Sequence, residues 1–170
     1  WGESGNSEVG HLTLGAGRTV LQYSTRISQS IESGDFYQNP ALLGAAEHVQ
    51  KNNSSLHILG LLGSGTVHSN FDHLLSLISF AQMRGISNVY LHLWTDGKDS
   101  GLKESPMIIK KLLDHIQATG VGKIATLIGR VYPMDRDNNW DKIQTAYDLF
   151  VNGKGEKADD IYKKISKDYA

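Results

Sequence analysis

The sequence predicts an α/β fold in which a mostly parallel sheet lies between flanking helices as a three-layer arrangement. Two observations support this prediction. From about residue 56 onward, short apolar runs typical of buried strands alternate with amphipathic stretches of helical period. Each helical stretch is long enough to cross back over a sheet, and strands joined by such crossovers pair in parallel. The expected core is therefore β-α-β-α-β-α.

The elements of this core can be placed on the sequence one by one. The first strand is the apolar run LHILGLL at 56–62, and the first helix, 71–84, repeats apolar residues at helical spacing before Gly85. The remaining core elements are a strand at 88–95, a helix at 104–119, a strand at 123–129 and a helix at 139–152. Outside the core we expect helices at 19–33, at 40–53 with Pro40 in the first turn, and in the polar tail 156–170.

Composition limits the possible classes of function. The 170 residues, of which 39% are hydrophobic, suffice for one ordinary core, and 17 basic against 18 acidic residues give a net charge of -1. Nucleic acid and membrane surfaces are therefore not expected partners. The absence of cysteine excludes disulfides and thiolate chemistry. Without a membrane-length apolar run or a signal-peptide pattern, the sequence predicts a cytoplasmic protein.

Three polar loops follow the three predicted strands. They read GSGTVHSN, DGKDSG and GRVYPMDRDNN, and in an open parallel sheet such loops meet at the carboxyl edge, where ligands bind. Two arginines with a lysine and a histidine suit a small phosphate or carboxylate dianion, because guanidinium groups bind such oxygens through paired hydrogen bonds. The polar residues expected at this edge are His68, Ser69, Asp96, Lys98, Asp99, Arg130, Asp135, Arg136 and Asp137.

Two alternatives remain open for residues of these loops. DRDNNW can equally be an aspartate–arginine network that caps the helix from Trp140, which would give Arg136 a structural role rather than a site role. His68 and His73 are five residues apart, about 140° around a helix, so they do not form the same-face pair of a zinc helix. His57 and His92 lie in predicted strands and are interpreted as packed residues. This leaves His68 as the histidine expected to face the loop cluster.

Four ordered motifs resemble those of the cofactor-independent phosphoglycerate mutases, a family of the alkaline phosphatase superfamily. They are GNSEVGHLTLGAGR at 5–18, GLLGSGTVHS at 60–69, TDGKDS at 95–100 and VGKIATLIGRVYPMDRDNNW at 121–140. Together they cover nearly the whole chain. The long GR…MDRDNNW loop is a feature of the mutases rather than of the superfamily, which disfavours another phosphomutase or a phosphatase.

The resemblance implies a reaction and its cofactors. The reaction interconverts 3-phosphoglycerate and 2-phosphoglycerate through a phosphoserine intermediate, as an isomerase step of glycolysis and gluconeogenesis. Ser7 corresponds to the serine that becomes phosphorylated and that also binds metal, since a serine hydroxyl needs a base or a metal to attack at neutral pH. The family uses two divalent ions, usually manganese, which stabilise the attacking and leaving oxygens. The complete enzyme is expected to be a monomer.

The resemblance also implies roles for residues of the three loops. His68 corresponds to the histidine that contacts the substrate phosphoryl group, and Asp99 to the aspartate that carries the proton of the substrate hydroxyl. Arg130 and Arg136 match two arginines that hold the phosphoglycerate. Lys98 stands where the family usually has an arginine, so this chain lacks one bidentate fork.

The chain also departs from the family in three other positions and in length. Ser64 replaces an aspartate, Thr66 a glycine, and Ser4 a methionine. Family members are roughly three times as long, with most metal ligands before the serine motif or far toward the C-terminus. We therefore expect an internal portion of a mutase that neither binds both metals nor turns over by itself. The alternative is a non-catalytic α/β module that binds phosphorylated metabolites.

Four segments are expected on this basis. They are the end of a phosphatase-like segment with the nucleophile motif at 1–20, connecting helices at 21–55, a partial phosphotransferase or substrate-binding domain at 56–153, and a C-terminal helix at 154–170.

Overall fold

The computed structural model describes residues 7–169. Ser4 and the first two residues of the serine motif lie outside this range. The chain divides into two compact units, Trp1–Gly44 and Ala45–Ala170, and each is described by itself.

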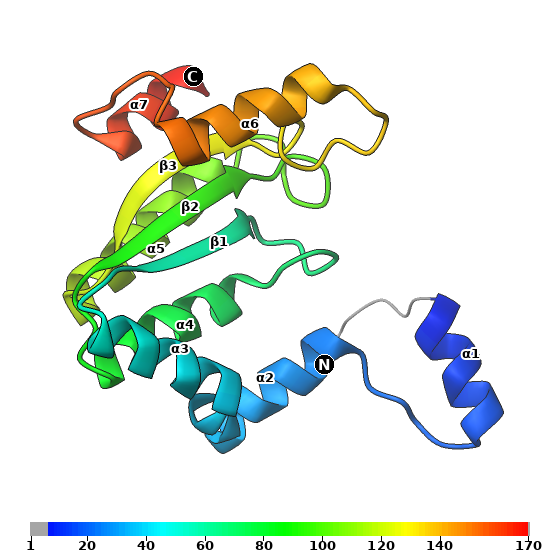
Figure 1. Ribbon diagram of the computed structural model, residues 1–170. Helices are drawn as coiled ribbons and strands as arrows, with labels where there is room; N and C mark the ends of the chain where they lie inside the picture. Colours follow the sequence, from blue (N-terminus) through cyan, green and yellow to red (C-terminus); the bar gives the residue numbers. More distant parts are fainter. Residues whose placement is uncertain (1–6, 170) are drawn as a thin grey trace. The chain divides into compact units, whose positions relative to one another are not determined.

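The unit 45–170 is built on a parallel sheet of three strands in the order β1-β2-β3 (Figure 1). The strands are β1 (Leu56–Leu62), β2 (Val89–Thr95) and β3 (Lys123–Gly129). Leu56 pairs with Val89 at the start of the sheet, and the register between β2 and β3 shifts once, between Leu91 and His92. The predicted parallel sheet and its three strands are confirmed.

Helices cover both faces of this sheet, which gives the predicted three layers (Figure 1). They are α4 (Phe71–Met83), α5 (Ser105–Thr119) and α6 (Trp140–Asn152). Successive side chains of a strand point to opposite faces. Leu91 and Leu93 of β2 are fully buried on one face, and on the other His92 and Trp94 contact the Phe150 ring of α6. The core therefore lies around β2.

The helix boundaries agree with the sequence where a cap or a glycine marks them. Asn70 caps α4 through its side chain, which accepts a hydrogen bond from the Asp72 N–H at 2.8 Å. Gly120 ends α5 with a φ of 69°, a left-handed conformation that favours glycine. The prediction for the tail is too long: it forms only the short helix α7 (Ile161–Asp168), which begins where the Asp160 side chain accepts the Lys163 N–H at 3.0 Å. The helix α3 (Pro40–Lys51) begins at the predicted proline.

The unit 1–44 is helical. It contains α1 (Ser7–Ala16), α2 (Tyr23–Ser33) and the short 3-10 helix η1 (Asp35–Gln38). The helix α1 is not predicted from the sequence, because Gly10 and Gly15 each lower helix propensity by about 1 kcal/mol relative to alanine. Glu8 lies in its first turn, where a carboxylate interacts favourably with the helix dipole. None of the residues of α1 is buried.

Across residues 7–169, no helix has both the length and the apolar character needed to span a bilayer.

Candidate functional site

The loops that follow β1, β2 and β3 meet at the carboxyl edge of the sheet, as predicted. The strand ladder continues by one residue beyond each of two strands: the Asp96 N–H donates to Leu62 O at 3.0 Å, and the Arg130 N–H donates to Thr95 O at 3.0 Å. Asp96 and Arg130 are thus the first residues after β2 and β3, on neighbouring strands. Their side chains form an ion pair, with Arg130 Nη1 2.8 Å from Asp96 Oδ1.

Asp96 is the most buried carboxylate of this edge, with 1% of its side chain exposed. Its Oδ1 accepts the backbone N–H groups of Gly97, Lys98 and Asp99 at 2.7, 2.9 and 3.2 Å, and its Oδ2 accepts the Ser100 hydroxyl at 3.1 Å. Burial by itself raises the pKa of Asp96. Hydrogen bonds from the Lys98 N–H, the Arg130 guanidinium and the other two N–H groups outweigh burial and hold the pKa well below its usual range.

Arg130 joins Asp96 to Asp99. The same Nη1 that binds Asp96 donates to Asp99 Oδ2 at 2.6 Å, and the Arg130 side chain is 15% exposed. The hydrogen bond to Asp99, followed by the weaker contribution of the one to Asp96, raises the pKa of Arg130. His68 Nε2 lies 3.8 Å from the same Asp99 oxygen, and the His68 side chain is 44% exposed. The structure therefore brings His68, Asp99 and Arg130 together.

The loop after β1, which carries His68, is clamped to the start of α5. The carboxylate of Glu104 accepts the Ser64 N–H at 2.9 Å and the Ser64 hydroxyl at 3.0 Å. Burial raises the pKa of Glu104, but the bonds from Ser64, Ser100 and Gly101 more than offset it, so the pKa is lowered. The Ser69 hydroxyl fixes the far end of the loop by donating to Leu61 O at 2.8 Å. An aspartate in place of Ser64 would oppose the Glu104 carboxylate.

Two glycines of this loop are required by close packing. A Cβ on Gly63 would lie 2.8 Å from the Asp96 Cβ, and one on Gly65 would lie 2.5 Å from the Asp99 carbonyl oxygen. Because backbone and short side chains cannot move aside cheaply, only glycine fits at these positions. The Gly65 N–H also donates to Ser100 Oγ at 3.0 Å. The first loop therefore lies directly against the second.

Lys98 and Arg136 are exposed, and no ion pair or side-chain hydrogen bond is found for either among residues 7–169. A network at the start of α6 exists, but Asp135 builds it. Its carboxylate accepts the Asn139 N–H and side-chain amide at 3.0 and 2.8 Å, and Lys142 Nζ lies 3.4 Å away. Hydrogen bonds from Asn139, stronger than the opposing effect of burial, lower the pKa of Asp135 to about 2. The predicted network before α6 is therefore present through Asp135, but Arg136 is not part of it.

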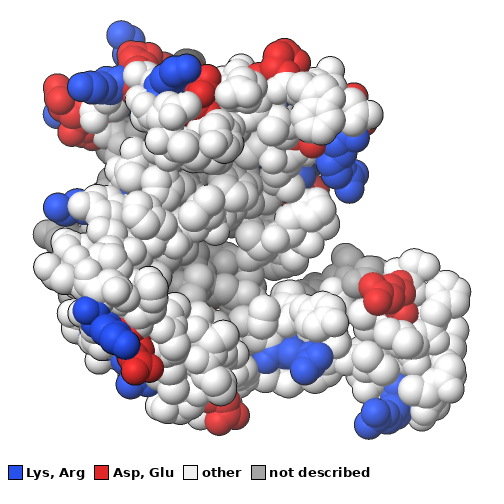
Figure 2. Space-filling view, viewed as in Figure 1, with Lys and Arg blue, Asp and Glu red and all other residues white. Residues whose placement is uncertain are grey.

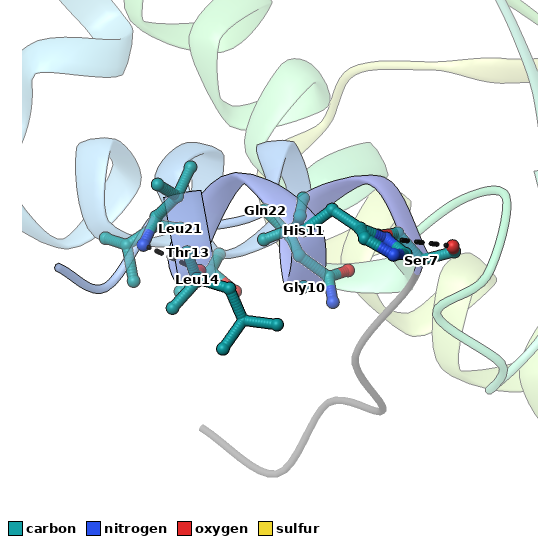
Figure 3. Close-up of a pocket in the computed structure, with 10 residues that line it drawn as sticks. Ser7, Gly10, His11, Thr13, Leu14, Leu21 and Gln22 are labelled. Atoms are coloured by element: carbon teal, nitrogen blue, oxygen red, sulfur yellow. Dashed lines mark hydrogen bonds between the residues drawn. The ribbon is translucent and has the colours of Figure 1, made fainter. Parts of the chain in front are cut away.

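Ser7 lies in the other unit, as the first residue of α1 and one turn before His11. His11 Nδ1 is 2.6 Å from the Ser7 carbonyl oxygen and 3.3 Å from Ser7 Oγ. The shorter contact requires a proton on Nδ1, so in this arrangement His11 donates and does not accept the serine proton. The two residues line one end of an open pocket of about 600 Å³, and Leu14 and Leu21 line the other (Figure 3).

The described residues do not supply the metal site that the resemblance implies. Within 7–169 no three or more histidine, aspartate or glutamate side chains are arranged to hold an ion. Ser7 is the one described residue to which the resemblance assigns metal binding, and a single hydroxyl does not make a two-metal centre. Residues 7–169 therefore do not fit the metal pair by themselves.

The surface charge is mixed. Lysines and arginines alternate with acidic residues on the face shown in Figure 2, as expected for a net charge of -1. Attraction for an anion must therefore be local, at the loop cations.

The structure adds residues to which sequence reasoning gave no role. Asp96, Ser100 and Glu104 hold the three loops together, and Ser64 is their partner in the first loop. A signal for Asp96 was available: an Asp-Gly pair directly after a buried strand favours a turn in which the aspartate accepts the following N–H groups. For Glu104 the sequence carries no such signal, because its partner is 40 residues away.

Comparisons with known proteins identify the family. Residues 27–170 match the family described as "BPG-independent PGAM N-terminus (iPGM_N)". A curated relative, the 2,3-bisphosphoglycerate-independent phosphoglycerate mutase of Clostridium botulinum, is 48% identical over 99% of this chain and 33% of its own length. The enzyme of the same name from Clostridium perfringens is 45% identical over the same shares.

A solved structure extends the comparison to the fold. The phosphoglycerate mutase of Leishmania mexicana, crystallised at low cobalt concentration, is 31% identical with a TM-score of 0.80, over 96% of this chain and 31% of that one. The chain thus spans about a third of the length of the relatives it matches. On the sequence match and the shared fold, this chain belongs to the BPG-independent phosphoglycerate mutase family, in the part described as its N-terminus.

Proposed function

We propose that this chain forms the phosphoglycerate-holding part of an enzyme that interconverts 3-phosphoglycerate and 2-phosphoglycerate. The observation that carries the proposal is the set of cations on the loops after β2 and β3: Lys98, Arg130 and Arg136. A phosphoglycerate carries a phosphate and a carboxylate, and guanidinium groups bind both through paired hydrogen bonds. The curated relatives are named as mutases of this class.

The geometry leaves donors available for such a ligand. Arg130 uses a single nitrogen, Nη1, for both of its carboxylate partners. Its Nε and Nη2 have no hydrogen bond to any of residues 7–169, so one edge of the guanidinium can bind a ligand. Lys98 and Arg136 are exposed and unpaired within the same range. Three cations from two loops thus suit the phosphate and the carboxylate at the two ends of one small anion.

The proposed reaction proceeds in two phosphoryl transfers. Ser7 Oγ gives up its proton and attacks phosphorus, the bond from phosphorus to the C3 oxygen breaks, and the C3 oxygen takes up a proton in its place. The glycerate is retained and reoriented, its C2 oxygen attacks the phosphoserine, and Ser7 Oγ leaves with a proton. Asp99 carries the proton of the substrate hydroxyl, and His68 contacts the phosphoryl group. Lys98, which stands where the family usually has an arginine, holds the carboxylate less rigidly than arginine would.

Two divalent ions, manganese in preference to others, are proposed for the complete enzyme. Most of their ligands would come from the two thirds of the relatives' length that this chain does not span. The complete enzyme is proposed to act as a cytoplasmic monomer. By itself, this chain is proposed to bind phosphoglycerate without turnover.

A non-catalytic module that binds phosphorylated metabolites is the second candidate. It is favoured by one observation: the three loop cations all belong to the unit 45–170, whereas Ser7 belongs to the unit 1–44. An enolase-coupled assay with added manganese on a protein that restores the full length of the relatives separates the two. Turnover that Ser7→Ala abolishes supports the mutase, and its absence with intact binding supports the module.

Calorimetric titration of 3-phosphoglycerate into this chain tests the binding directly. We expect saturable binding that Arg136→Ala and Lys98→Ala each weaken about tenfold, the loss of one charge-assisted contact. Lys163→Ala, which removes an exposed cation of α7, is the matched control and should bind like the unchanged chain. Glycerol 3-phosphate, which lacks the carboxylate, should bind more weakly. Equal binding by all variants, or none by the unchanged chain, would contradict the proposal.

A further inference from the structure

Asp96 combines deep burial with many hydrogen bonds. Its two oxygens accept five hydrogen bonds, four at Oδ1 and one at Oδ2. These bonds all come from the protein, and the side chain is 1% exposed, so the carboxylate faces the protein rather than a ligand. Asp96 therefore differs from Asp99, which is more exposed and accepts Arg130 at a single oxygen.

The five donors come from the loop after β2 and the loop after β3, which carry Lys98, Arg130 and Arg136. Three are successive N–H groups of 97–99, so the carboxylate sets the path of the turn that carries Lys98 and Asp99. The fourth is the Arg130 guanidinium, from the next strand. Burying a charge away from water is costly unless such bonds replace the lost hydration. Here they outweigh the effect of burial and hold the pKa of Asp96 low.

The remaining loop closes over the same carboxylate. The Cα of Gly63 approaches so closely that an added Cβ would touch the Asp96 side chain, and the Gly65 N–H binds Ser100, which is itself bound to Asp96 Oδ2. The loop that carries His68 thus rests on the Asp96–Ser100 pair. All three loops thus contact Asp96, either directly or through Ser100.

We propose that Asp96 is the positioning residue of this site. It orients Arg130 so that Nη1 faces the protein while Nε and Nη2 face a ligand, and it fixes the turn that presents Lys98 and Asp99. Asp96 itself does not touch the substrate. The inference rests on the proposed function for the identity of the ligand, but the orientation of Arg130 is a property of the ligand-free chain and can be measured without it.

The first test needs no substitution at Asp96. Nuclear magnetic resonance of the arginine guanidinium groups reports hindered rotation and slowed proton exchange where Nη protons are held. Arg130, assigned by its absence from Arg130→Lys, should show separate Nη signals at low temperature. Arg136, exposed and unpaired among residues 7–169, is the internal control and should show averaged signals. An Arg130 that averages like Arg136 would overturn the proposal.

The second test compares Asp96→Asn with Asp114→Asn, the same change in an exposed ion pair of α5. Both are titrated with 3-phosphoglycerate at a temperature where circular dichroism shows them folded. Asp96→Asn should release the Arg130 signals and weaken binding at least tenfold, and Asp114→Asn should do neither. A folded Asp96→Asn with held Arg130 signals and unchanged affinity contradicts the proposal.

The two proposals can fail separately. If the unchanged chain does not bind 3-phosphoglycerate, the proposed function fails while the Arg130 signals still decide the role of Asp96. If binding is normal but Arg130 rotates freely, the function stands and the positioning role of Asp96 is wrong.

Discussion

The loop cluster of the unit 45–170 and the helix α1 of the unit 1–44 differ in how they are held. In the loop cluster, Asp96 is nearly inaccessible and the three loops are joined by ion pairs and hydrogen bonds between residues more than 30 apart in sequence. In α1 no residue is buried, and the Ser7–His11 contacts lie within one helical turn. Among residues 7–169, long-range bonds hold the first region, whereas the bonds of Ser7 are local.

This difference shows which side chains are already oriented before a ligand binds. Binding groups contribute most when their orientation is already set before the ligand arrives. Arg130 and Asp99 meet that condition, since each has partners from another strand or loop. Among residues 7–169, the Ser7 side chain is oriented by His11 of its own helix. We therefore expect that loss of a buried loop contact changes stability and binding together, whereas loss of the Ser7 hydroxyl in α1 changes neither strongly.

The largest effect is expected for Arg130→Ala. It leaves the buried Asp96 carboxylate without its cation, and breaking a buried pair by removing one partner destabilises by about 3 kcal/mol. Chemical denaturation should show this loss. Ser7→Ala, the matched change in α1, should alter the unfolding free energy by no more than about 0.5 kcal/mol. Similar losses for both variants would remove the distinction between the regions.

The same glycine-to-alanine change should lower stability in the loop cluster and raise it in α1. Gly65→Ala forces a methyl group against the Asp99 carbonyl and should destabilise by about 2 kcal/mol. Gly15→Ala in α1 meets nothing within 4 Å and should raise helix stability by about 1 kcal/mol. Denaturation measures the first, and amide hydrogen exchange within α1 measures the second. Tolerance of alanine at Gly65 would show that the two loops are not in contact.

Substitutions that weaken the Glu104–Ser64 clamp on the first loop should have a moderate effect on the free energy of unfolding. Glu104→Gln keeps one acceptor for Ser64 but loses the charge and the second acceptor, so a loss of about 1 kcal/mol is expected. Ser64→Asp, which restores the residue usual in the family, should destabilise more because it sets two carboxylates against each other. A stabilising Ser64→Asp would show that Glu104 does not face this position.

The smallest effect concerns pH. The pKa of Asp135 lies at about 2, below the ordinary value of 3.8, so its ionised form is favoured by folding. Its contribution to stability is present above pH 4 and is lost as pH falls toward 2. The difference in unfolding free energy between the unchanged chain and Asp135→Asn should therefore shrink over that window. A difference that stays constant from pH 6 to pH 2 would contradict the stabilising role of the Asp135–Asn139 hydrogen bonds.

The sequence predicts the sheet, its order of elements and the meeting of the loops because these follow from local patterns. Apolar runs mark β1, β2 and β3, and parallel strands place their following loops at one edge. It does not predict α1, whose glycines argue against a helix, nor the Glu104–Ser64 clamp, which depends on tertiary packing. The roles given to Ser7, His68, Lys98, Asp99, Arg130 and Arg136 remain predictions from family resemblance.

The measurement that tests the central claim most directly is a titration of the isotopically labelled chain with 3-phosphoglycerate, followed by amide chemical shifts. We expect saturable changes in the amide chemical shifts of residues 63–70, 96–104 and 130–139. The amide chemical shifts of α1 should stay unchanged. Shifts confined to α1 and its pocket, or no shifts at any concentration, would contradict the claim that the loop cluster of this chain holds the substrate.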